Sequence, residues 1–369
     1  MGLGKGRKLG ISRDVGPALE RQHQCISVDP FLVHLCPRGA KSHSVPSSDF
    51  SSFYRYAVPG LVMVLTSVFY GNRTAGPSIA KIRDSNAVAL SGNTYIPVAV
   101  FVGGTSGIGQ AMAEAFARHT NGNAHIIIVG RNREAGERII AGFPKPTSPS
   151  AKHEFVACDA SLMKNIQETT TELLTRLSKI NHLVLSTGIL SLHGRDETEE
   201  GLDKKLAVHY YGRWKFIDGL VPALVKAKEA GEAANAFSVL GAGHGGPVDL
   251  EDFGLKKTFT EYALRYPSLS FAHAFPGHVR TNIMAASPSA FLRIASPLVT
   301  GPLSPFKRPG DAGEYLLNGL VNTTLAPGAW RIGEYGEDMG KTNYFGDAES
   351  RRRLWQHTVK ATGSTENTK

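Results

Sequence analysis

The 369-residue sequence is poor in cysteine and lacks a long uninterrupted apolar run, and each shortage excludes a class of protein. Its three cysteines form no CxxC pair and have no zinc-like spacing with histidines. None of the 13 histidines makes an HxxxH or HExxH pattern on a predicted helix, so we predict no metal site. The cysteine usage favours a reduced, cytoplasmic environment.

The longest apolar run, residues 56–70, is uncharged but is broken by Pro59 and Gly60. It is shorter than the roughly 18 to 20 residues that span a bilayer. We therefore favour a loosely docked extension without membrane contact, and keep membrane association through residues 56–70 as the alternative.

The basic excess of +9 is concentrated at the N-terminus, where residues 1–90 hold 11 of the 41 basic but only 5 of the 32 acidic side chains. No Lys/Arg run is interleaved with aromatic residues, so we do not expect nucleic-acid binding. Gly, Pro and Ser interrupt every short apolar run before residue 90. This composition predicts a poorly structured basic extension over 1–90.

From Pro97 onward, apolar runs of strand length alternate with helical stretches, which is the pattern of parallel βαβ units. Near-continuous Ile, Val and Leu indicate a sheet covered on both faces. We predict strands at 97–102, 125–129, 153–158, 182–186, 235–241, 269–275 and 329–334, and helices at 110–119, 165–178, 202–226, 311–321 and 349–358. The fold class is thus α/β, a Rossmann-type doubly wound parallel sheet in one main domain (95–335), followed by a C-terminal helix and tail (336–369).

The first predicted strand runs directly into GGTSGIG, residues 103–109, and then into an Ala-rich helix. In that setting Gly103 permits the tight turn, Gly107 lets the backbone approach a pyrophosphate, and Gly109 allows close helix packing. The pyrophosphate lies at the helix N-terminus, where free N–H groups favour an anion. The sequence therefore predicts a nicotinamide dinucleotide site.

The end of the second strand distinguishes NADP from NAD, because a carboxylate there would bind the ribose 2′-hydroxyl and repel a 2′-phosphate. This chain has Val129-Gly130-Arg131-Asn132 and no acidic residue. A guanidinium can bind a phosphate through two hydrogen bonds, so NADP is predicted over NAD. A solvated loop cation is the alternative role for Arg131. Asp159, after the third strand, is placed to accept from the adenine amino group.

Four short motifs stand out over about 97–281: GGTSGIG at 103–109, GRN at 130–132, CDAS at 158–161 and PGHVRT at 276–281. With these motifs, this part of the sequence resembles the short-chain dehydrogenase/reductase family. HYYGRWKFI and SVLGAGHGG are similar to a divergent fungal group of it. The resemblance implies Gly103, Ser106, Gly107, Ile108 and Gly109 at the pyrophosphate, Arg131 at the 2′-phosphate, Asp159 and Ala160 at adenine, Gly188 at the adenine ribose, and Pro276, Gly277, Val279 and Thr281 at the nicotinamide carboxamide. Their neighbours Thr105, Asn132 and Thr187 complete the predicted cofactor-binding set.

The family's catalytic Ser/Tyr/Lys set is not found at its usual places. The fifth strand is followed by Leu240-Gly241-Ala242, without a hydroxyl, and His209 stands where the family has an Asn. Among the tyrosines only Tyr211 has a Lys four residues later, Lys215, but this pair lies in the helix before the fifth strand. Tyr211, Lys215, His209 and His244 are therefore weak catalytic candidates, and ordinary helix or loop roles are the alternative.

The connection after the fifth strand is short. The nine residues 258–266 span only about 13 Å as a helix, whereas a six-residue strand covers roughly 20 Å. Either the chain reconnects by a short helix, or a segment carrying part of the active-site helix is missing from it, which reading the transcript across 257–261 would decide. The family commonly forms homodimers through this helix, so its shortness leaves the oligomeric state open.

Residues 282–308 are rich in Ser, Pro and apolar side chains and are expected to cover a lipophilic substrate. The leading hypothesis is an NADP-dependent short-chain-type oxidoreductase acting on a lipophilic carbonyl or alcohol. The alternative is a cofactor-binding pseudoenzyme or inactive product that lacks the Ser/Tyr/Lys set.

Overall fold

The computed structural model describes residues 76–242, 258–302, 304–340 and 347–364. Residues 56–70, His244 and most of the short connection after the fifth strand lie outside these ranges, so the predictions made for them stay predictions. Thr258–Arg265 is helical, which places a helix of eight residues at the end of that connection.

A seven-stranded parallel sheet forms the centre of the described chain, in the order β3-β2-β1-β4-β5-β6-β7. The order runs outward in both directions from the β1/β4 pair, so the predicted doubly wound Rossmann-type sheet is confirmed. The strands are β1 Val98–Val102, β2 His125–Gly130, β3 Lys152–Ala157, β4 His182–Leu185, β5 Asn235–Val239, β6 Ser270–Ala274 and β7 Gly328–Ile332.

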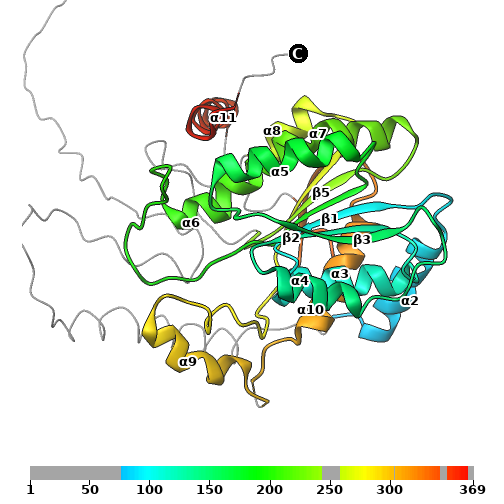
Figure 1. Ribbon diagram of the computed structural model, residues 1–369, viewed down its shortest axis with the longest axis horizontal. Helices are drawn as coiled ribbons and strands as arrows, with labels where there is room; N and C mark the ends of the chain where they lie inside the picture. Colours follow the sequence, from blue (N-terminus) through cyan, green and yellow to red (C-terminus); the bar gives the residue numbers. More distant parts are fainter. Residues whose placement is uncertain (1–75, 243–257, 303, 341–346, 365–369) are drawn as a thin grey trace, which may run out of the picture.

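Helices cover both faces of the sheet (Figure 1). One layer contains α5 Met163–Arg176, α7 Gly212–Glu229 and α8 Thr258–Arg265, with α11 Ala348–Thr362 packed outside it. The other contains α2 Ile79–Ser91, α3 Gly107–His119, α4 Arg133–Ala141 and α10 Pro309–Asn318. α9 Ala290–Thr300 projects from the body of the domain at lower left.

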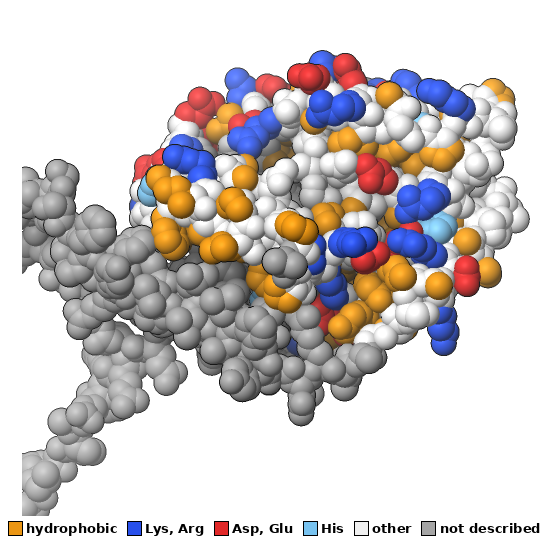
Figure 2. Space-filling model, turned by 90° about the horizontal axis from the view of Figure 1, so that it is seen from below, with side chains coloured by type: hydrophobic (Ala, Val, Ile, Leu, Met, Phe, Trp, Pro, Cys, Tyr) orange, Lys and Arg blue, Asp and Glu red, His pale blue; other side chains and the backbone are white. Residues whose placement is uncertain are grey.

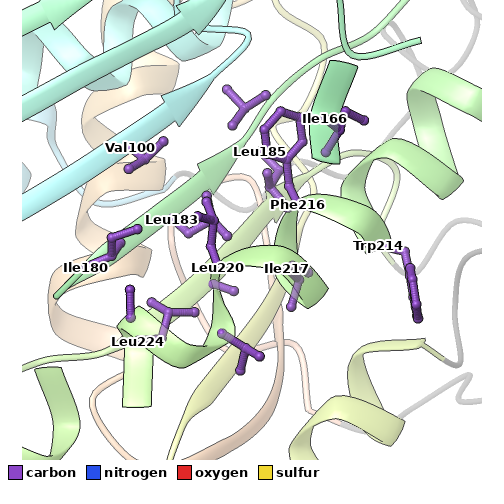
Figure 3. Close-up of a cluster of buried hydrophobic side chains, with 14 of the residues drawn as sticks. Val100, Ile166, Ile180, Leu183, Leu185, Trp214, Phe216, Ile217, Leu220 and Leu224 are labelled. Atoms are coloured by element: carbon purple, nitrogen blue, oxygen red, sulfur yellow. The ribbon is translucent and has the colours of Figure 1, made fainter. Parts of the chain in front are cut away.

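The core is divided by the sheet into two apolar clusters. On one side Ile217, Leu220 and Leu224 of α7 pack on Leu183 and Leu185 of β4 (Figure 3). On the other, α3 and α10 pack against the opposite face of the same strands. Because alternate side chains of a strand point to opposite faces, burial on both faces requires the continuous apolar strands seen in the sequence.

The prediction of a poorly structured chain up to residue 90 is wrong for its last part, because α2 occupies Ile79–Ser91. Ile82, Asn86 and Leu90 are its buried face. Asn86 donates to the backbone oxygen and to the carboxylate of Glu314 on α10, at 3.0 and 2.9 Å. A contact with a residue this distant in sequence stabilises a helix whose local composition does not predict it.

The long helix predicted at 202–226 is divided into three parts: α6 Lys204–Leu206, a π-helical segment η1 Ala207–Tyr211, and α7. A second π-helical segment, η3 Gly319–Thr323, follows α10. Each π turn adds a residue and so changes which side chains share a face of the helix. Tyr211 ends η1 and Lys215 lies in α7, so the π turn includes Tyr211 and precedes Lys215.

Figure 2 shows the face below the sheet of Figure 1, where Lys and Arg side chains are mixed with Asp, Glu and apolar ones. Among the described helices, none is long and apolar enough to cross a membrane.

Candidate functional site

The carboxyl ends of β1 and β4 lie side by side at the point where the strand order reverses. Open parallel sheets bind their ligands outside this edge, in the crevice between the two loops that leave it in opposite directions. Here these are the glycine-rich loop 103–109 and the segment 186–189. The predicted site therefore sits where the topology places one.

The glycines of the 103–109 loop are required by close approaches. Gly103 and Gly107 have φ of 84° and 59°, a region that side chains disfavour. A Cβ at Gly109 would lie 2.1 Å from Ser186 Oγ and 2.5 Å from the oxygen of Gly103. The loop is thus folded tightly against the end of β4, and Ser106 is its exposed residue.

Neither the N-cap residue nor the first turn of α3 neutralises the N-terminus of this helix. Ser106 is its N-cap residue but makes no side-chain capping bond, and the first turn holds no acidic residue. The first amides of a helix carry partial positive charge and need acceptors. The glycine cradle and these amides fit a dinucleotide pyrophosphate. Thr105 lies beside Gly130 and Ile108 packs on the core below the loop.

Arg131 and Asp159 meet at the predicted adenosine end of the site, with 4.0 Å between a guanidinium nitrogen of Arg131 and Asp159 Oδ2. The Arg131 side chain is 72% exposed. Asp159 Oδ1 is occupied, because it accepts from the backbone N and the hydroxyl of Ser161 at 2.9 and 2.7 Å. Asn132 caps α4 by accepting from Ala135 N at 2.9 Å. Asn132 therefore has a structural role here.

Ala160 is buried next to the start of α7, where a Cβ on Gly212 would lie 2.6 Å from the Ala160 oxygen. Thr187 directs its hydroxyl to the oxygen of Val208, at 3.4 Å. Both residues therefore tie the carboxyl edge of the sheet to η1 and α7.

His209 holds the loop after β4. Its Nε2 accepts from the backbone N of Ile189 at 3.1 Å, so the ring proton belongs on Nδ1. Burial, reinforced by the charge of Arg213, lowers the pKa of His209 to about 3. A Cβ on Gly188 would lie 3.6 Å from the same ring nitrogen. His209 is therefore neutral at neutral pH and holds the backbone of the loop after β4.

Sequence reasoning missed Arg213, a buried arginine one helical turn after His209. Its guanidinium donates to the oxygen of Leu185 at 2.8 Å, to Ser238 Oγ at 2.6 Å and to the oxygen of Thr187. Burial lowers its pKa to about 9, so it is still charged at neutral pH. The sequence shows only a single basic residue inside an apolar helix, which does not distinguish a buried arginine from an exposed one.

The loop after β6 closes the other end of the site. Gly277 has φ of 73°, and Val279 pairs with Lys307 across a β-bridge. Thr281 reaches the glycine-rich loop, because a Cβ on Gly107 would lie 3.3 Å from Thr281 Cγ2. The structure therefore brings the segment 276–281 to the predicted pyrophosphate loop, as the predicted cofactor set requires.

Tyr211 and Lys215 do not form a pair at this edge. The hydroxyl of Tyr211 lies 2.8 Å from His357 Nε2, and Lys215 Nζ donates to Ser364 Oγ at 2.8 Å. Both partners belong to α11 or follow it directly, on the outer side of η1 and α7. The π turn that ends at Tyr211 has changed the face on which these residues lie.

The usual tyrosine position offers no replacement within the described residues. Tyr262 of α8 is fully buried, donates to the oxygen of Trp214 at 3.1 Å and stacks on Phe271. Burial raises its pKa well above the ordinary value. Residues 240–242 after β5 carry no hydroxyl, and His244 lies outside the described ranges. No metal-ligating cluster is found in the described part of the chain.

The sheet topology and the glycine-rich loop define a nicotinamide-dinucleotide-binding Rossmann protein. The family model described as short chain dehydrogenase matches residues 97–248. Oxidoreductase AN1596 of Emericella nidulans is 33% identical over 258 residues, covering 64% of this chain and 74% of that protein. The chain belongs to the short-chain dehydrogenase/reductase family.

More distant proteins share most of the chain. Polyprenol dehydrogenase of Mus musculus is 23% identical over 287 residues, covering 72% of this chain and 84% of that protein. The crystal structure of an uncharacterized protein from Mycobacterium paratuberculosis is 16% identical and superimposes with a TM-score of 0.53, covering 80% of this chain and 100% of that one. The structural likeness supports the fold alone.

Proposed function

We propose that this protein is an NADP-dependent oxidoreductase acting on a lipophilic carbonyl or alcohol. The observation that carries the cofactor preference is the exposed guanidinium of Arg131 at the end of β2, where a carboxylate would select NAD. The open N-terminus of α3 would hold the pyrophosphate. The bound nicotinamide supplies a hydride to, or accepts one from, the substrate carbon.

The apolar character of the substrate is proposed from the segment that follows Thr281. Met284, Leu292 and Ala295 form a separate cluster with Leu190 and Leu192 of the loop after β4. Ile283 lies close to Gly188, because a Cβ on Gly188 would be 3.7 Å from Ile283 Cδ1. An apolar lid over this edge favours an apolar substrate. The name of the murine relative, polyprenol dehydrogenase, points in the same direction.

A cofactor-binding protein without its own turnover is the second candidate. The observation that favours it is the engagement of the two best tyrosines elsewhere, Tyr262 with Trp214 and Tyr211 with His357. General acid catalysis needs a proton donor within reach of the substrate oxygen.

Both candidate functions predict binding of the cofactor, but only the oxidoreductase predicts turnover of a substrate. The full chain is mixed with NADPH and a panel of ketones of increasing chain length, with absorbance of NADPH as the measurement. Oxidation of NADPH that grows with substrate chain length supports the oxidoreductase. NADPH binding at micromolar or lower concentration, with no oxidation for any ketone, favours the binding protein. Failure to bind NADPH or NADH removes both.

A further inference from the structure

A second polar site lies at the amino ends of the strands, at the sheet edge opposite the cofactor loop. Three residues in register, His182 on β4, Asn235 on β5 and Ser270 on β6, each begin their strand. Each is only 3% exposed. Registered residues on neighbouring strands point to the same face, so these form one buried polar row in an otherwise apolar sheet. Such a row is costly unless its polar groups find partners.

The row is hydrogen-bonded at one end and has an unpartnered, buried hydroxyl at the other. His182 Nδ1 lies 2.8 Å from Asn235 Oδ1, and Asn235 Nδ2 donates to the oxygen of Leu320 at 3.2 Å. Since the amide oxygen is an acceptor, His182 Nδ1 carries the ring proton and Nε2 is an acceptor. Burial lowers the pKa of His182 to about 4, so this ring is neutral at neutral pH. Ser270 Oγ has no hydrogen-bond partner among the described residues.

The same three side chains line a cavity of about 270 Å³. Its apolar walls come from Leu90 at the end of α2 and from Leu320 and Val321 of the π-helical segment η3. Single π turns inside helices are frequent at functional sites. The volume is below the range of drug-sized pockets, roughly 300–1,000 Å³, and suits a small molecule.

The charges at this cavity favour an anion. Lys228 lines it and makes no ion pair with another described residue, whereas Glu232 is already bound by Lys179 and Asn181. Tyr95 accepts from Ala233 N at 3.1 Å and so keeps its own O–H as a donor. Among the lining side chains, Lys228 thus offers a cation, Tyr95 and Ser270 each carry a hydroxyl, and His182 offers an imidazole acceptor.

We propose that this cavity, lined by His182, Ser270 and Lys228, binds a small hydroxycarboxylate. The carboxylate pairs with Lys228, and the ligand hydroxyl lies between His182 Nε2 and Ser270 Oγ. Because Ser270 Oγ is enclosed in the ligand-free chain, this contact requires the Ser270 hydroxyl to rotate towards the cavity. This site is separate from the cofactor site, from which a five-residue strand separates it by roughly 17 Å.

Glycerate serves as the probe. Glycerol is the analogue that lacks its charge, and propionate is the analogue that lacks its hydroxyls. Melting temperature and calorimetry are measured on the full chain without NADPH and at saturating NADPH. We expect saturable stabilisation by glycerate, and a much weaker effect of either analogue. Absence of saturable stabilisation, an equal effect of glycerol or propionate, or displacement by NADPH would overturn the proposal.

Three single substitutions test whether glycerate binds in this cavity. Ser270→Ala and Lys228→Met are each expected to raise the dissociation constant for glycerate about tenfold, the loss of one good hydrogen bond or ion contact. Lys226→Met, two residues away on the exposed side of α7, should bind as the parent does. Equal affinity in all three variants contradicts the site.

The ligand-free melt of Ser270→Ala tests the simpler explanation, a polar row that serves only the fold. Because Ser270 Oγ has no partner, we expect its removal to leave the melting temperature within about 2 °C. A larger fall means that this hydroxyl is part of the folded structure without ligand, and overturns the proposal.

Discussion

Arg213 donates a hydrogen bond to Ser238 Oγ over 2.6 Å, and both side chains are buried beneath the carboxyl ends of β4 and β5. The same guanidinium holds the backbone oxygens of Leu185 and Thr187, on either side of the turn where β4 ends. Three acceptors from two adjacent strands therefore depend on one side chain. Arg213 fixes the edge of the sheet on which the predicted nicotinamide end of the site rests.

Substituting Arg213→Leu should lower the free energy of unfolding by about 3 kcal/mol. Each buried acceptor left without a donor costs about 1–3 kcal/mol, and removal of a desolvated charge offsets part of the loss. Urea denaturation is the measurement. Arg138→Leu is the matched control, because Arg138 is 71% exposed and pairs with Glu134 at 3.8 Å. A change below about 0.5 kcal/mol is expected there, and an equally small change for Arg213→Leu would show that the clamp is dispensable.

Glu314 makes stability depend on pH in the acid range. Burial raises its pKa, but hydrogen bonds from His119, Asn86 and Arg118 outweigh this and hold the pKa at about 2, below the ordinary 4.5. A depressed carboxyl pKa stabilises the fold above pH 4.5, and the contribution is lost as pH falls towards 2. A difference of this size corresponds to up to about 3 kcal/mol.

Glu314→Gln should therefore be less stable than the parent at pH 7 and approach it at pH 2 to 3, as followed by urea midpoints across the acid range. Glu134→Gln is the control, since that carboxylate is 90% exposed. If the parent and Glu314→Gln keep a constant difference from pH 7 to pH 2, the carboxylate does not contribute through its charge.

The sheet could be predicted because its signal is local: strands buried on both faces need continuous apolar residues, and β1 and β2 have them. The glycine-rich loop could be placed for the same reason. α2 could not, because its stability comes from Asn86 bonding to Glu314, 228 residues away. Local propensity carries no information on such a partner.

The catalytic candidates show a second limit of prediction from the sequence. The spacing of Tyr211 and Lys215 assumes an uninterrupted α-helix, and η1 breaks that assumption at the residues concerned. Nothing in the residue types of AVHYY announces a π turn. Arg213 was missed for the opposite reason, because single basic residues in helices are common and its burial is visible only in three dimensions.

Arg131→Ser should weaken NADPH binding about 10- to 100-fold and leave NADH binding nearly unchanged. The guanidinium is proposed to bind only the 2′-phosphate, and a charged hydrogen bond is worth about 1.5–3 kcal/mol. Quenching of protein fluorescence gives both dissociation constants. Arg133→Ser is the control, because Arg133 pairs with Glu137 at 3.1 Å and lies over the Phe155 ring. Equal losses for NADPH and NADH would mean that Arg131 does not select NADP.

Tyr211→Phe should leave both NADPH affinity and any turnover of ketones unchanged, because its hydroxyl lies 2.8 Å from His357 Nε2 on α11 and not at the cofactor edge. We expect a loss of about 1 kcal/mol in the free energy of unfolding, the usual value of one hydrogen bond. Thr187→Ala, at the carboxyl end of β4, is the comparison variant and is expected to affect NADPH binding instead. A turnover that disappears in Tyr211→Phe while NADPH still binds would return the proton-donor role to Tyr211, and would require η1 to turn its side chain from α11 towards Gly188 during the reaction.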